Sequence, residues 1–139
     1  MAKIARVLGK TADAEQYEAV ASAARPKYHQ LYFNASAGLY NGGYDLDAQS
    51  LTAAPLAMGD IIPEPMVPKV LTALHDNIAS FNYHLTFGSV GAKHLLVELS
   101  KNNMFDVAMQ IATQRTFPGF GHWLALGATT CWENWLVGL

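Results

Sequence analysis

The stretch from residue 64 to residue 80 reads Glu-Pro-Met-Val-Pro-Lys-Val-Leu-Thr-Ala-Leu-His-Asp-Asn-Ile-Ala-Ser, and it has the clearest periodicity in the chain. Its apolar residues recur at intervals of three and four, which places them on one face of a helix: Val67, Val70, Leu71, Leu74 and Ile78. Prolines cluster at its start, where the first turn of a helix accepts them: Pro63, Pro65 and Pro68. The pattern predicts a helix over residues 64–80 that is buried along one side.

Similar signals predict helices on both sides of this stretch. Gly9 ends a first helix, and further helices are expected over residues 13–33, 47–58, 89–99, 104–113 and 129–137. Pro26 is expected to kink or restart the second helix, and Asp47 to cap the third. The helix at 89–99 is nearly all apolar and is expected to be buried on most sides. Short loops join these helices, so the sequence predicts an all-α fold of helical hairpins.

The composition limits the class of protein. The 139 residues are 51% hydrophobic and 14% charged with a formal net charge of -2, which indicates one compact domain with some surface meant for burial. No basic cluster offers a footprint for nucleic acid or an anionic membrane. No stretch approaches the ~18 apolar residues of a membrane span. Charged residues follow Met1 before a signal peptide's apolar core forms, so we expect a soluble, intracellular protein.

Disulfide, metal and cofactor chemistry find no support in the sequence. Cys131 is the single cysteine, which excludes an internal disulfide and a zinc site built from several thiolates. We expect Cys131 to be a small apolar filler. No two histidines share a metal-ligand spacing with a carboxylate, so no metal and no other cofactor is expected.

Three loops share a chemistry rich in glycine and aromatic residues: Tyr-Asn-Gly-Gly-Tyr-Asp-Leu-Asp-Ala-Gln-Ser at 40–50, Asn-Tyr-His-Leu-Thr-Phe-Gly-Ser at 82–89 and Phe-Pro-Gly-Phe-Gly-His-Trp at 117–123. If the hairpins alternate in direction, these loops lie at the same end of the fold. Sugars present apolar C–H faces to rings and hydroxyls to polar groups. The loops therefore predict a carbohydrate-binding rim.

Three ordered motifs carry a resemblance to a known family. His-Leu-Thr-Phe-Gly at 84–88, Gln-Arg-Thr-Phe-Pro-Gly-Phe-Gly at 114–121 and Gly-Ala-Thr-Thr-Cys-Trp-Glu-Asn-Trp at 127–135 resemble the C-terminal half of the catalytic domain of bacterial-type α-L-rhamnosidases. The resemblance covers nearly the whole chain. It implies that residues 1–139 form a single partial domain, about half of an (α/α)6 barrel of six helical hairpins. It also implies inverting hydrolysis of terminal α-L-rhamnosyl residues.

Glu133 stands between Trp132 and Trp135 in an otherwise uncharged segment. The resemblance implies that Glu133 is the general base. Inversion also needs a carboxylic acid ~6.5–9.5 Å away that protonates the leaving oxygen. The family carries it in a segment of the type Asp-Glu-Arg-x-Gly-Trp-x-Gly-Asp, which this chain lacks. On residue types alone, Glu133 is a first-turn helix carboxylate favoured by the helix dipole, and the tryptophans are core.

The candidates for contact with the sugar are His84, Trp132, Trp135, His122, Trp123 and Gln49. The resemblance implies that His84 reaches substrate hydroxyls and that the indoles form an apolar wall. Each has a structural alternative: His84 satisfies backbone carbonyls at a loop–helix junction, and His122 and Trp123 pack the turn. Two functions therefore stay open. The first is a glycoside hydrolase completed by a general acid from elsewhere, and the second is a non-catalytic module for carbohydrate binding or protein interaction. An exposed half-barrel face further predicts self-association.

Overall fold

The computed structural model describes residues 1–41, 48–86, 89–133 and 135. Helices dominate these ranges, as predicted for an all-α fold: α1 (Ala2–Val7), α2 (Thr11–Tyr32), α3 (Ala48–Met58), α4 (Val67–Ser80), α5 (Ser89–Lys101), α6 (Phe105–Ala112) and α7 (Phe120–Ala125). A 3-10 turn, η2 (Glu64–Met66), leads into α4. Two short strands, β1 (Phe33–Asn34) and β2 (Leu39–Tyr40), pair antiparallel where a loop was expected. No helix within the described ranges is both long and apolar enough to cross a bilayer.

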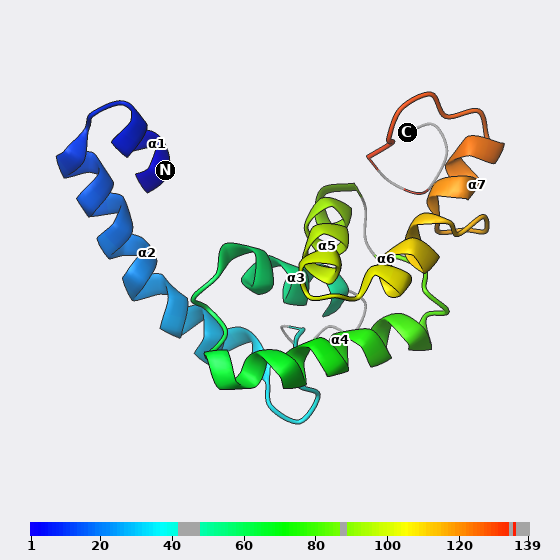
Figure 1. The fold of residues 1–139 in the computed structure, drawn as a ribbon, viewed down its shortest axis with the longest axis horizontal. Coiled ribbons are helices and arrows are strands. Elements are labelled where there is room, and N and C mark those ends of the chain that lie inside the picture. The colour runs from blue at the N-terminus through cyan, green and yellow to red at the C-terminus, as the bar shows by residue number, and fades with distance from the viewer. Residues whose placement is uncertain (42–47, 87–88, 134, 136–139) are drawn as a thin grey trace.

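The helices divide into an arm and a body (Figure 1). The arm is α1 folded back along α2, and Gly9 makes the turn between them with a φ of 69°. Ala14 is the one buried residue of α2. The helix continues through Pro26, so the expected restart does not occur. Because Pro26 is exposed, water can replace the backbone hydrogen bond that proline removes.

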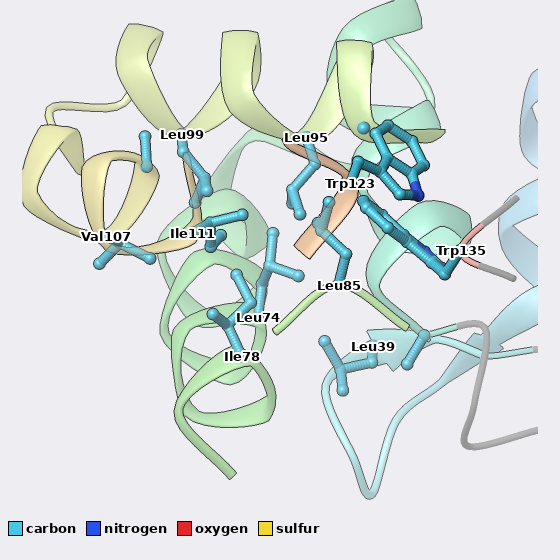
Figure 2. Packing of buried hydrophobic residues seen from close by; sticks show 14 residues of the cluster. Leu39, Leu74, Ile78, Leu85, Leu95, Leu99, Val107, Ile111, Trp123 and Trp135 are labelled. Carbon is cyan, nitrogen blue, oxygen red and sulfur yellow. The ribbon is translucent and has the colours of Figure 1, made fainter. Parts of the chain in front are cut away.

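The body is organised around α4, whose predicted apolar stripe faces its core. Val70, Leu74 and Ile78 are fully buried. Figure 2 shows Leu74 and Ile78 from α4 gathered with side chains of the neighbouring helices: Leu95, Leu99, Val107 and Ile111. Burying a side chain of this size is worth about 1.5–3 kcal/mol. The residues that form the α4 stripe in the sequence therefore also hold the body together.

The helix α5 is buried on one side only, so the expectation of burial on most sides is wrong. Ala92, Leu95 and Leu99 face the core, whereas Lys93 and His94 are exposed. The reason lies in its neighbours, because α5 packs against α3 and α6 and nothing described covers its remaining face. The high apolar content of α5 therefore does not mean that the helix is buried on most sides.

The helix predicted over residues 129–137 is also wrong, because residues 129–133 and 135 are not helical. The helix in this region is α7, in part of what was expected to be a turn, and it ends where the Ala128 N–H donates to the carbonyl of Trp123 at 3.0 Å. Cys131 is exposed rather than a core filler. The segment after α7 packs its tryptophans onto that helix, and such tertiary contacts override local helix propensity.

Candidate functional site

Two of the three loops expected at one rim meet in the structure. The His84 Nε2 atom lies 2.8 Å from the Thr116 hydroxyl oxygen. The side-chain amide of Gln114 donates to the carbonyl of Asn82 at 2.9 Å. Loop 81–86, which follows α4, is therefore joined to loop 113–119, which precedes α7, by two side-chain hydrogen bonds. The third loop includes residues 42–47, with Asp47 among them, and these lie outside the described residues.

The hydrogen bonds of His84 fix its neutral tautomer. Its Nδ1 atom lies 3.2 Å from the carbonyl oxygen of Phe81 and 3.0 Å from that of Asn82. Carbonyl oxygens only accept hydrogen bonds, so Nδ1 carries the hydrogen. In the neutral ring Nε2 then accepts from the Thr116 hydroxyl. The structural alternative for His84, satisfaction of backbone carbonyls, is met here, and its second nitrogen is used by the neighbouring loop.

Gln49 also holds loop 81–86, through two hydrogen bonds of its side-chain amide. Its side chain is fully buried at the start of α3, where it donates to the His84 carbonyl at 3.1 Å. Its amide oxygen accepts from the N–H of Thr86 at 3.2 Å. The amide thus bridges two backbone groups of loop 81–86, as a neighbouring strand would. Gln49 holds the loop in place, and its polar atoms are engaged with protein.

The tryptophans of the last motif form one aromatic cluster with the start of α7. The rings of Trp123 and Trp135 stack with centroids 4.1 Å apart, and both are largely buried (Figure 2). Phe120 meets both rings edge-on, at 5.7 and 5.6 Å. Trp132 is half-buried and lies 6.3 Å from Trp123. Trp123 and Trp135 therefore serve mainly as packing residues, while Trp132 keeps part of its surface open.

Glu133 lies at the exposed edge of this cluster. Its side chain is accessible to solvent, and among the described residues it has no hydrogen bond or ion pair. The flanking residues Trp132 and Trp135 are held by their rings, so the segment is placed by aromatic contacts. An exposed carboxylate can accept a proton from water, so general-base chemistry is one of the reactions open to this position.

His122 points its ring at Phe117, with centroids 5.4 Å apart in an edge-on arrangement. It is half-buried in α7, one residue before Trp123. Sequence reasoning missed Gln114, Thr116 and Phe120 as members of the site. The signal was present, since all three fall in the quoted motif at 114–121. No group of three His, Cys, Asp or Glu residues in the described ranges is arranged to hold a metal ion.

Comparison with known proteins identifies a family and relatives that are similar to this chain over nearly its whole length. The family model described as bacterial alpha-L-rhamnosidase 6 hairpin glycosidase domain matches residues 1–138. The alpha-L-rhamnosidase of Streptomyces avermitilis is 33% identical over 134 residues, which are 96% of this chain and 12% of that protein. That of Formosa agariphila is 27% identical over 135 residues, or 96% of this chain and 14% of that protein.

Solved structures agree. The alpha-L-rhamnosidase from Dictyoglumus thermophilum has a TM-score of 0.81 at 32% identity, over 97% of this chain and 15% of that one. The Streptomyces avermitilis enzyme complexed with L-rhamnose has a TM-score of 0.79 at 31% identity, over 96% of this chain and 12% of that one. The chain thus spans about an eighth of the length of the Streptomyces relative. The resemblance found in the three motifs is confirmed, and the chain belongs to the bacterial alpha-L-rhamnosidase six-hairpin glycosidase domain family, a family of glycoside hydrolase domains.

Proposed function

We propose that this chain is the part of a six-hairpin glycosidase domain that carries the general base for inverting hydrolysis of terminal α-L-rhamnosides. Glu133 is the proposed base, and it takes a proton from the water that attacks the anomeric carbon. The observation that carries the proposal is the family match over residues 1–138 together with a solvent-accessible Glu133 at the edge of the aromatic cluster. A carboxylate in that setting meets both water and an apolar sugar face.

The aromatic edge suits a deoxy sugar. The partly open ring of Trp132, the residue that precedes Glu133 in the chain, offers apolar surface, and a methyl group in place of a hydroxyl favours contact with such a ring. His84, Gln49, His122, Trp123 and Trp135 are engaged mainly with protein, so we assign them to positioning. Substrate contact within this chain is proposed for Trp132 and Glu133.

The general acid must come from outside this chain. No Asp-Glu pair occurs in the 139 residues, so the acidic segment typical of the family is absent. General acid assistance is worth about 10²–10⁴-fold in rate. We therefore expect the isolated chain to be nearly inactive on substrates whose leaving group needs a proton.

A substrate with an activated leaving group tests the proposal. Dinitrophenyl α-L-rhamnoside releases a phenolate that needs no protonation, so the missing acid matters little. We expect slow release of rhamnose by the purified chain, with the β anomer appearing first in a proton NMR time course. First appearance of the α anomer would contradict an inverting base.

A second function is favoured by the absent acidic segment. A chain with the base but no acid fits a non-catalytic module that binds carbohydrate or another protein. Titration with L-rhamnose, followed by tryptophan fluorescence, separates the two candidates. Saturable quenching without release from the activated rhamnoside would support the binding module, and release would support the hydrolase.

The arm also supports self-association of the chain. Among the residues of α2, large apolar side chains are exposed: Tyr17, Val20, Leu31 and Tyr32. We propose that two copies of the chain associate through α2, so that each copy covers these side chains of the other. Val20→Glu should then shift a sedimentation profile toward monomer, whereas Ala19→Glu, an exposed position on another face of α2, should not. A wild-type chain that is monomeric at high concentration would overturn this part of the proposal.

A further inference from the structure

Gln114 makes contacts in two directions from one position. Its side-chain amide donates to the carbonyl of Asn82 at 2.9 Å and so reaches loop 81–86. Its own carbonyl accepts from the N–H of Gly121 at 2.8 Å and so reaches the first turn of α7. The two partners are far apart in sequence. Gln114 is therefore bonded both to loop 81–86 and to the start of α7, beside the separate bond between His84 and Thr116.

The contact with α7 leaves little freedom of movement. A Cβ atom added at Gly121 would lie 2.8 Å from the Gln114 carbonyl oxygen and 2.8 Å from the Arg115 Cα. One added at Gly119 would lie 2.8 Å from the Gln114 Cβ. These distances are too short for a real carbon atom, so only glycine allows this approach. The start of α7 is therefore packed directly on the backbone at Gln114 and Arg115.

The start of α7 in turn positions the segment that bears Glu133. Phe120 and Trp123 contribute the rings on which Trp135 packs, and Trp123 also contacts Trp132. Those two tryptophans flank Glu133, which has no hydrogen bond or ion pair of its own within the described ranges. A displacement of α7 would therefore move the carboxylate.

We propose that Gln114 is a positioning residue for Glu133, acting through the first turn of α7 and the aromatic cluster. This inference rests on the proposed role of Glu133 as the base. Its test measures structure and needs no substrate, so failure of this inference can be distinguished from failure of the proposed function. If Glu133→Gln leaves the hydrolysis rate unchanged, the proposed function is wrong, while the coupling from Gln114 to residues 132–135 is still measured.

The experiment compares Gln114→Ala with Gln110→Ala. Gln110 is an exposed glutamine at the end of α6 with no hydrogen bond among the described residues, so it controls for loss of the side chain. Amide hydrogen exchange is followed at Asn82, whose N–H donates to the Ala79 carbonyl, and at Gly121, whose N–H donates to the Gln114 carbonyl. Loss of the hydrogen bond from the Gln114 side chain to the Asn82 carbonyl should speed exchange about 5- to 10-fold at both amides in Gln114→Ala only. The near-ultraviolet circular dichroism of the stacked tryptophans should fall with it.

A charge variant distinguishes loss of this one hydrogen bond from a general loss of stability. In Gln114→Glu the carboxylate cannot donate to the Asn82 carbonyl at neutral pH, whereas the protonated acid at low pH can. We expect the tryptophan dichroism to be weak at pH 7 and to recover toward the wild-type value at pH 4, with no such recovery for Gln110→Glu. Faster exchange at Asn82 with unchanged exchange at Gly121 and unchanged tryptophan dichroism would overturn the proposal. A variant that does not fold would be replaced by Thr116→Val, which removes the parallel bond to His84 and should give a smaller change of the same kind.

Discussion

Loop 81–86 and the segment carrying Glu133 are held by different kinds of contact. The loop is fixed by directional hydrogen bonds from Gln49, Gln114 and the Thr116 hydroxyl. Trp132 and Trp135 beside Glu133 pack their rings on Trp123, and Trp135 also packs on Phe120. The first arrangement leaves no polar side-chain nitrogen of His84 free, whereas the second leaves the Glu133 carboxylate free of protein partners among the described residues.

The difference means that the two regions depend on different residues. Loop 81–86 is held through its own polar groups, whereas Glu133 is placed by the ring contacts of its neighbours, and its side chain is open to water. Each region should therefore respond to a different substitution.

The aromatic cluster should give the largest loss. We expect Trp123→Ala to lower the free energy of unfolding by about 3–5 kcal/mol, because it removes a buried ring and the platform for Trp135. Leu124→Ala is the control, since Leu124 is the next residue in α7 and is 71% exposed. Urea denaturation measures both. A loss below about 1 kcal/mol in Trp123→Ala would mean that the rings do not hold this segment.

The polar support of the loop should give the next largest loss. Gln49→Ala leaves the His84 carbonyl and the Thr86 N–H without their partner, and we expect a loss of about 2–4 kcal/mol. Gln110→Ala should stay within about 0.5 kcal/mol. Tryptophan dichroism should change less in Gln49→Ala than in Trp123→Ala. Equal dichroism changes would show that the two regions are not held separately.

Alkaline pH tests a third region, the buried cluster around Tyr40 in β2. Burial, with a smaller contribution from Tyr28, raises the pKa of Tyr40 from its ordinary value of 10.0 to about 12. A folded-state pKa above the unfolded value means that stability is complete below pH 10 and is lost as pH rises toward 12, by about 2–3 kcal/mol. Tyr40→Phe should reduce this dependence to the part that comes from Tyr28, whose pKa burial and Tyr32 also raise. Tyr17→Phe, at an exposed position, should retain it in full. An unchanged alkaline loss in Tyr40→Phe would assign the effect to another group.

The smallest effect is expected at the second link between the loops. Thr116→Val removes the hydroxyl that pairs with His84 Nε2, and we expect a loss of about 1 kcal/mol because water can reach this position. Thr11→Val, at an exposed position at the start of α2, is the matched control. A loss as large as that in Gln49→Ala would show that the exposed link matters as much as the buried one.

The sequence predicted those parts of the fold that depend on local pattern. The apolar stripe at Val70, Leu74 and Ile78 sufficed to place α4 and its buried face. The segment after α7 was predicted as a helix over residues 129–137, whereas Trp132 and Trp135 in fact pack as part of a non-helical segment. Their partner Trp123 is brought to them by tertiary packing, which a local pattern does not record. The exposure of Cys131 was missed for the same reason.

The loops and motifs of the sequence offered His84, Gln49 and the tryptophans as candidates, and the structure brings His84 and Gln49 into one hydrogen-bonded group. Sequence reasoning offered them as sugar ligands, since residue type alone does not reveal that a polar atom is already used. The burial of Gln49 supplies that information. Glu133 as the base stays a prediction.

The most direct test of the central claim is the rate of dinitrophenyl α-L-rhamnoside hydrolysis by the wild-type chain, Glu133→Gln and Glu64→Gln. Glu64 is exposed at the start of η2, so its substitution controls for loss of a carboxylate. We predict that Glu133→Gln is slower than the wild type by about 10²-fold or more and that Glu64→Gln is unchanged. Equal rates for the wild type and Glu133→Gln, with both chains folded, would contradict the assignment of Glu133 as the base.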